Sequence, residues 1–283
     1  MCSKKHSDIP PRRGDTGGGG ASTGGTTTGG DGTTGGTTSL GPTGTVQFGT
    51  LYYYPSYPSV ESIASAWFRS PSASAEPGDC VARFRACSVS TCNDSSGTTT
   101  NSVPASAGDI TFTASPEGFQ AVLSPDATKS YGTTSLSGYL GGEETVTIVA
   151  TGADVPAFET TMTYPLLLLL TSPDASATEG VATASRTDDL VLEWDRGAPG
   201  KTFLVQTQNT NPSDAFLNCS VPSETGVLAI PAAALAYLAP STELLLLTMN
   251  LTHVTAGSYD VSVMGFGAVM IPDRTRRASI VVE

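Results

Sequence analysis

Short stretches in which apolar and polar residues alternate, separated by turn residues, constrain the fold of this chain most. In the stretch ETVTIVA, Val146, Ile148 and Ala150 fall on one face of an extended strand, and Thr145 and Thr147 fall on the other. Successive side chains of a β-strand point to opposite faces, so this pattern is typical of a strand buried on one side. Turn signals recur about every ten residues, a spacing typical of β-sandwiches. The sequence therefore predicts an all-β fold.

The strand-like stretches fall into two groups, which predict two antiparallel, immunoglobulin-like β-sandwich domains. The first group occupies residues 46–172 and the second occupies residues 186–283. Residues 173–185 hold few large apolar side chains, so we expect an interdomain segment there. The aliphatic run at residues 166–170 predicts either a strand buried on both faces or a strand between the domains. The only helical stretch is IPAAALAYLAP, where Pro231 and Pro240 bound one or two turns.

The N-terminal region has a different composition. Residues 14–45 consist mostly of Gly and Thr and have almost no apolar side chains, so nothing offsets the entropy of ordering them. We expect a disordered linker whose ends lie on the order of 30 Å apart. Cys2 precedes this linker, and we predict it to be a lipid-attachment site. Residues 1–45 are thus assigned to anchor and linker.

Composition excludes some classes of protein. The net charge of −12 repels phosphate backbones, so we expect no nucleic-acid partner. The longest aliphatic run is far shorter than the ~20 residues that a membrane-spanning helix needs. No apolar segment of a signal peptide follows Met1. This leaves two alternatives: the protein is cytosolic, or the sequence begins at a mature end to which Met1 was added.

Several motifs occur in a characteristic order. Cys2 and the linker are followed by CVARFRACSVSTC, then by GGEETVTIVATGADVPAFETTMTYP, TSP and DLVLEW. The C-terminal half adds a spaced set of residues: Cys219, Gly226, Ile230, Pro231, Leu235 and Leu238. Over residues 46 to 283 this series resembles a family of uncharacterised two-domain surface lipoproteins from myxobacteria and related bacteria. The resemblance implies a secreted, lipid-anchored, all-β protein of the outer membrane or cell surface, without a known activity. The signal peptide of that family is missing here, so the anchor is inferred from Cys2 alone.

Four further cysteines allow several disulfide pairings. We favour a bond from Cys80 to Cys87, and Cys80 to Cys92 is the next choice. Cys87 and Cys92 differ in strand parity, so a bond between them would need a bulge or bend. Three buried free thiols are the alternative. We expect Cys219 to be unpaired and buried, or bonded to the thiol that the local bridge leaves over. No histidine lies close to these cysteines, so we predict no metal site.

The stretch LYYYPSYP is the most unusual part of the predicted folded region. It groups Tyr52, Tyr53, Tyr54 and Tyr57 around two prolines. Tyrosine rings give contact area at a low entropy cost, so we predict a ligand platform for an envelope polysaccharide or a protein. In the alternative interpretation one face of this strand packs into the core and the other covers a neighbouring loop.

The chain shows little sign of catalytic residues. A Ser-His-Asp triad would have to use His253, and no GxSxG motif supplies a nucleophile. The adjacent acids at 143–144 and 188–189 fit solvated turns, with calcium ligation as the alternative. The RGD tripeptide at 13–15 is interpreted as chance. We therefore predict no catalytic residue and no cofactor.

Together these observations predict a noncatalytic cell-envelope lipoprotein that displays β-sandwich domains for binding or structural roles. One alternative is a carbohydrate-binding or adhesion module, with or without calcium. A second is a secreted hydrolase that acts through His253, and a third is a cytosolic protein with reduced cysteines. The lipidated Cys2 would provide contact with the membrane.

Overall fold

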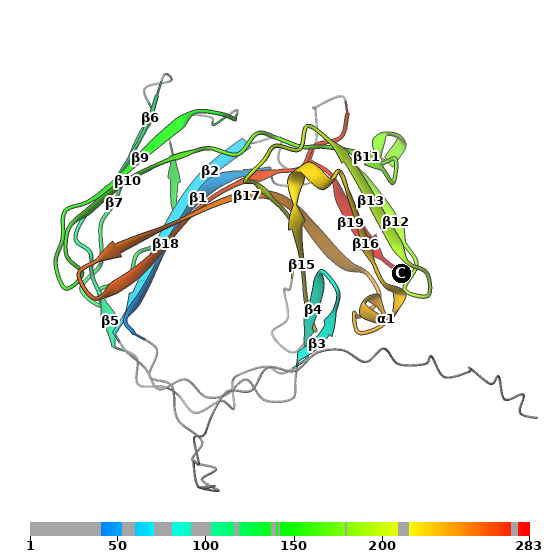
Figure 1. Cartoon of the computed structure of the whole chain (residues 1–283), viewed down its shortest axis with the longest axis horizontal. Helices are drawn as coiled ribbons and strands as arrows, with labels where there is room; N and C mark the ends of the chain where they lie inside the picture. Colours follow the sequence, from blue (N-terminus) through cyan, green and yellow to red (C-terminus); the bar gives the residue numbers. More distant parts are fainter. Residues whose placement is uncertain are drawn as a thin grey trace, which may run out of the picture. The chain divides into compact units, whose positions relative to one another are not determined.

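The chain folds into β-strands that form three sheets in the computed structural model (Figure 1). The structure describes residues 41–52, 60–70, 81–91, 103–115, 119–136, 140, 142–178, 180–208, 215–272 and 277–283. All of them lie in one unit, Thr37–Glu283. The predicted all-β class is confirmed for this described part of the chain.

Twelve of the described strands form the largest sheet, whose main path runs β3-β4-β15-β14-β17-β18-β1-β2-β5. Strand β8 adds to β2, β19 adds to β17, and β12 adds to β19. Along the main path the strands are β3 (Val81–Phe84), β4 (Cys87–Ser90), β15 (Phe216–Pro222), β14 (Thr202–Thr207), β17 (Thr242–Ala256), β18 (Tyr259–Ala268), β1 (Thr43–Tyr52), β2 (Val60–Arg69) and β5 (Pro104–Ala105). The added strands are β8 (Thr134–Leu136), β12 (Val181–Ala184) and β19 (Ser279–Val282).

Two smaller sheets complete the described strands. The first has the order β10-β9-β6-β7 and the second has the order β11-β13-β16. Their strands are β10 (Phe158–Thr163), β9 (Thr145–Ala150), β6 (Ile110–Ser115), β7 (Phe119–Leu123), β11 (Leu169–Ser172), β13 (Leu190–Asp195) and β16 (Val227–Ile230). The helical pieces are η2 (Ser176–Thr178), η3 (Ser223–Thr225) and α1 (Ala232–Leu235).

Each small sheet packs on a different part of the large sheet and encloses a hydrophobic core. In the first core, Phe48 of β1 lies 5.5 Å from Phe112 of β6, measured between ring centroids. In the second core, Trp194 of β13 stacks on Phe203 of β14 at 3.9 Å. The alternation of apolar and polar residues explains both cores, because it turns one face of each strand inward. Each core lies between two layers of sheet, as in a β-sandwich.

The pairing of strands crosses the predicted domain boundary. Strand β1 pairs with β18, and β4 pairs with β15, although the members of each pair lie on opposite sides of residues 173–185. That segment itself contains β12, which pairs with β19. The division into two immunoglobulin-like domains is therefore not confirmed and stays a prediction. The β1–β18 and β12–β19 pairs are parallel, so the expectation of purely antiparallel sheets was wrong.

Three local predictions differ in detail from the structure. Strand β1 begins at Thr43, inside the predicted linker, because backbone pairing with β2 and β18 needs no apolar side chains. The leucine run at 166–170 enters a strand only at Leu169, and it leads from the first core to the second. The predicted helix is present as α1, a single turn that follows Pro231. Within the described residues, no helix is long and apolar enough to cross a membrane.

Candidate functional site

Most residues predicted to have a functional role lie outside the described part of the chain. These residues are Cys2, Tyr53, Tyr54, Tyr57, Cys80 and Cys92. Tyr52 is the last residue of β1 and pairs in register with Val60 of β2. The lipid attachment and the tyrosine platform therefore stay predictions.

Cys87 forms a disulfide with Cys219, which corrects the preferred bond between Cys80 and Cys87. The two bonded residues lie opposite each other on β4 and β15, with their Cα atoms 4.0 Å apart. Ser220 donates its backbone N–H to the carbonyl of Ala86 at 3.0 Å, so the neighbouring cysteine pair occupies a non-hydrogen-bonded position, where side chains approach most closely. Cys219 is buried, as expected, and of the two alternatives stated for it the structure has the bonded one, with Cys87 as the partner. The preferred local pairing failed because the partner strand is remote in sequence.

His253 lies beside Ser262 and Asp260 on the β17–β18 hairpin, but these side chains do not form a catalytic triad. Ser262 Oγ is 3.4 Å from His253 Nδ1, and Asp260 Oδ1 is 3.6 Å from the same nitrogen. A triad requires the nucleophile and the carboxylate at opposite ring nitrogens. The geometry therefore gives no support to a hydrolase that uses His253.

Two of the four acids considered as calcium ligands accept backbone hydrogen bonds. Glu144 Oε2 accepts the backbone N–H of Gly142 at 2.8 Å, and Asp189 Oδ1 accepts that of Ala232, at the start of α1, at 2.8 Å. Among the described residues, no group of three or more His, Cys, Asp or Glu side chains could hold a metal ion.

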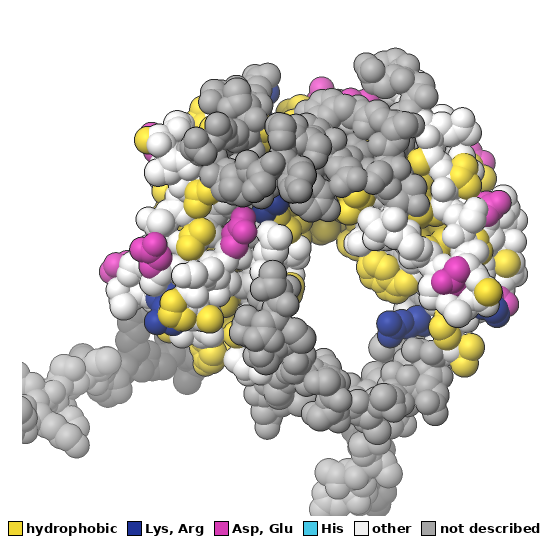
Figure 2. Space-filling model, turned by 180° about the vertical axis from the view of Figure 1, so that it is seen from behind, with side chains coloured by type: hydrophobic (Ala, Val, Ile, Leu, Met, Phe, Trp, Pro, Cys, Tyr) yellow, Lys and Arg dark blue, Asp and Glu magenta, His cyan; other side chains and the backbone are white. Residues whose placement is uncertain are grey.

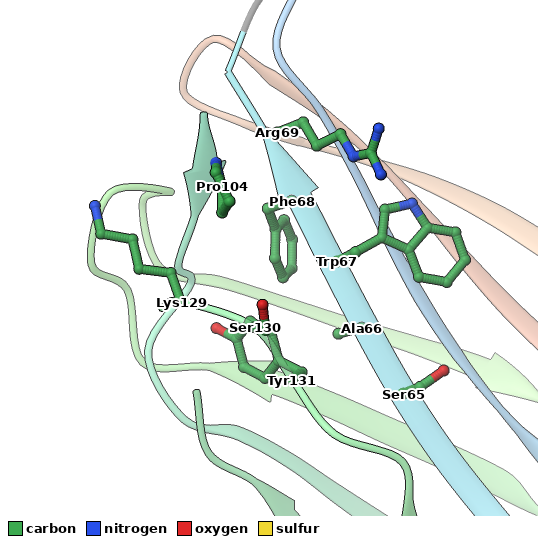
Figure 3. Close-up of a pocket in the computed structure, with 9 residues that line it drawn as sticks. All are labelled: Ser65, Ala66, Trp67, Phe68, Arg69, Pro104, Lys129, Ser130 and Tyr131. Atoms are coloured by element: carbon green, nitrogen blue, oxygen red, sulfur yellow. The ribbon is translucent and has the colours of Figure 1, made fainter. Parts of the chain in front are cut away.

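Trp67 of β2 is a large aromatic side chain on a solvent-exposed face, and it provides the best candidate for a binding site. In β2 the side chains of Ala64, Ala66 and Phe68 are buried in the first core, whereas Trp67 is 43% exposed. Figure 3 shows Trp67 and Arg69 on one side of the β2 ribbon and Tyr131, Lys129 and Pro104 on the other. The pleat of the strand thus presents an indole ring and a guanidinium group together.

Polar side chains continue from Trp67 across the same face of the large sheet. Trp67 pairs in register with Thr45 of β1, Thr45 with Ser262 of β18, and Ser262 with His253 of β17. Directly paired residues share a face, so these four residues form a row perpendicular to the strands, which we call the Trp67 row. In the next row, Gln47 donates its side-chain N–H to Ser65 Oγ at 2.8 Å.

A cavity of about 310 Å³ opens at the edge of β2 beside this row (Figure 3). Strand β8 covers the edge at Ser62–Ala64 and β5 covers it at Phe68 and Arg69. Between them, no described strand pairs with this edge of β2 at Ser65–Trp67. The cavity occupies this gap, and Pro104, Lys129 and Ser130 are among the residues that line it.

Tyr131 fixes the wall of the cavity. Its hydroxyl donates to the carbonyl of Gly108 at 2.8 Å and accepts the backbone N–H of Ala107 at 2.8 Å. Its ring meets Phe68 edge-on, with 5.7 Å between the centroids. Burial raises the pKa of this phenol. These contacts tie the loop before β8 to the core beneath Trp67.

Two carboxylates, Asp126 and Asp154, order the loop that carries Tyr131. Asp126 Oδ1 accepts the backbone N–H groups of Thr128 at 2.8 Å and of Ser130 at 2.9 Å, and hydrogen bonds led by that from the Thr128 hydroxyl lower its pKa. Lys129 Nζ lies 2.8 Å from Asp154 Oδ2, and this bond is the main cause of the lowered pKa of Asp154. Lys129 is therefore neutralised locally.

Charges are sparse near the Trp67 row. The row next to the Trp67 row is Arg69–Thr43–Asp260–Thr255, and Asp260 is its only carboxylate. Asp260 Oδ1 lies 3.6 Å from His253 Nδ1. Figure 2, which views one face of the molecule, shows acidic side chains singly or in small groups among uncharged ones. The Trp67 row is a mostly neutral surface on a chain with a net charge of −12.

Sequence reasoning predicted the strand ASAWFRS but did not single out Trp67. The signal was present, because two adjacent aromatic residues in one strand must point to opposite faces. The sequence does not show which of the two rings is buried. In the structure Phe68 is the buried one.

No family model matches the chain, and no curated protein matches it. Among solved structures, the chain is similar to the crystal structure of a tetra-tandem repeat in the extending region of a large adhesion protein, at 11% sequence identity and a TM-score of 0.22. The similarity covers 82% of this chain and 50% of that one, so this chain spans about half of its length. At this TM-score the similarity carries no argument.

Proposed function

We propose that this chain is a noncatalytic cell-envelope protein, held by a lipid on Cys2, that displays a β-rich unit for binding at the cell surface. The Cys87–Cys219 disulfide is the observation that carries this proposal. Disulfides persist in oxidising compartments and are rare in the cytosol. The Gly/Thr-rich tract that begins at residue 14 and precedes β1 would separate the unit from the membrane.

The mass of the N-terminal peptide of protein isolated from its native cells tests the anchor. We expect Met1 to be absent and Cys2 to carry a mass of lipid size, together with retention in the membrane fraction. A Cys2→Ser variant should be released from that fraction, and the double variant Cys87→Ala/Cys219→Ala should not. An unmodified N-terminus combined with freely alkylated Cys87 and Cys219 would instead identify a cytosolic protein.

The second candidate is a carbohydrate-binding or adhesion module, and the exposed Trp67 favours it. A ligand that covers an exposed indole on a flat, mostly neutral sheet removes a large apolar area from water, which favours binding. Binding of polysaccharide that depends on Trp67 would support this function. The hydrolase alternative predicts turnover that is lost in a His253→Ala variant, and a single ring nitrogen that faces both Ser262 and Asp260 argues against it.

A further inference from the structure

We infer that the Trp67 row is a binding site for a neutral polysaccharide, with Trp67 as the stacking platform. This inference deepens the proposed binding role and rests on it. It does not depend on the lipid anchor, because the residues concerned all belong to the described β-rich unit.

The exposed indole supplies the apolar part of the site. One face of a pyranose ring presents C–H groups, and the negative face of an aromatic ring attracts such weakly positive edges. The exposed area of Trp67 is removed from water when a sugar covers it, whereas Trp194, the other tryptophan of the chain, is only 3% exposed. Trp67 is therefore the one tryptophan that a ligand can reach directly.

The neighbouring strands supply hydrogen-bonding groups at regular intervals. Thr45 and Ser262 follow Trp67 across the sheet, and Gln47 and Ser65 form a bonded pair one row away. Adjacent strands are about 4.8 Å apart, so the row from Trp67 to His253 spans roughly 14 Å. Hydroxyl and amide groups can both donate and accept, as sugar hydroxyls do. A short run of sugar units could lie along this row.

Charge favours a neutral rather than an anionic chain of sugars. The net charge of −12 repels an anionic polymer at long range. Near the row, Arg69 is the cation on the same face. Lys129 lines the neighbouring cavity, but its charge is paired with Asp154. Asp260, which lies two strands from Arg69 in the row Arg69–Thr43–Asp260–Thr255, opposes a second anionic group. A guanidinium can still donate to sugar hydroxyls without requiring a carboxylate.

The gap in the edge of β2 gives the site depth beside the flat row. The cavity of about 310 Å³ places Ser130 and Pro104 next to the strand that carries Trp67. Because Tyr131 is hydrogen-bonded to the 107–108 backbone, this wall is formed before any ligand arrives. A substituent or branch of the polymer would fit into this gap.

Native gel electrophoresis of the full chain through gels that contain one polysaccharide each tests the proposal. The probes are hydroxyethylcellulose, galactomannan, dextran and glycogen, with polygalacturonate as the anionic comparison. We expect at least one neutral polymer to retard the chain, and Trp67→Ala to raise the dissociation constant roughly tenfold or more, as for an aromatic anchor. Tyr237→Ala removes another exposed aromatic side chain, outside the Trp67 row, and should change nothing.

A second measurement on the unaltered chain covers the case in which Trp67→Ala fails to fold. Acrylamide should quench the exposed Trp67 and spare the buried Trp194, and the retarding polysaccharide should protect the quenchable fraction. Retention by polygalacturonate alone, retention by no neutral polymer, or retention that survives in a folded Trp67→Ala variant would overturn the inference. A lipid on Cys2 without neutral-glycan binding would leave the envelope role standing and remove this site.

Discussion

Removal of the Cys87–Cys219 disulfide should lower the free energy of unfolding by several kilocalories per mole. The bond closes a loop across a sequence separation of 132 residues, for which the loop-entropy relation gives about 5 kcal/mol at 25 °C. Measured effects of single disulfides are more often about 2–4 kcal/mol, because denatured chains keep residual structure and native strain intervenes. Both cysteines are buried, so alanine is a better replacement than serine.

Urea unfolding, followed by far-ultraviolet circular dichroism, measures this change. The double variant Cys87→Ala/Cys219→Ala should have a lower midpoint than the oxidised protein, and reduction of the unaltered chain should produce a similar loss. A double variant keeps either cysteine from pairing elsewhere. A loss below about 1 kcal/mol would refute the loop-entropy reasoning. Peptide mapping that finds Cys87 bonded to Cys80 would refute the pairing itself.

Four further predictions concern the wall of the cavity, the loop that forms it and the open face of the sheet. Tyr131→Phe leaves the Ala107 N–H and the Gly108 carbonyl without their partner, so it should cost about 1–3 kcal/mol in thermal or urea unfolding. The raised pKa of Tyr131 means that the folded state holds this proton more tightly, so stability should fall as the pH rises through the folded-state pKa, which absorbance at 295 nm can follow. The lowered pKa values of Asp126 and Asp154 have the opposite sign: their contribution is present above the usual value of 3.8 and should disappear as the pH falls through the folded-state pKa values, measured by carboxyl NMR. Gly49→Ala would put a Cβ 2.1 Å from the Phe266 carbonyl oxygen, so it should lower the melting temperature strongly, whereas Gly132→Ala, where a Cβ meets nothing within 4 Å, should not.

Local periodicity predicted most strands of this fold, whereas the pairing between strands was beyond its reach. The alternation in residues 145–150 is local, so the predicted faces of β9 match the buried Val146, Ile148 and Ala150. The parallel pairing of β1 with β18 joins segments about as far apart in sequence as the fold allows, and no local pattern specifies it. The same reason explains why Cys80 was preferred over Cys219 as the partner of Cys87.

The leucine run at 166–170 shows a second source of error. A run of apolar residues indicates burial but does not distinguish a strand from a crossing segment. Here Leu168 and Leu170 are buried in the second core while Tyr164 is buried in the first, so the chain passes from one core to the other. Trp67 was overlooked because the sequence does not show which of two adjacent aromatic residues packs into the core and which stays exposed.

The position of β1 has a mechanical consequence. Strand β1 lies between β18 and β2, and its first residue, Thr43, pairs with Arg69, next to the row that begins at Trp67. In a chain held at residue 2 and loaded by a ligand at Trp67, tension would enter β1 at Thr43 and leave β2 at Trp67. These two residues lie at the same end of the antiparallel β1–β2 pair, so the load would fall on the few residue pairs at that end and open them one after another. Forced unfolding is governed by the unfolding rate, so resistance to pulling would depend on these pairs more than on the rest of the fold.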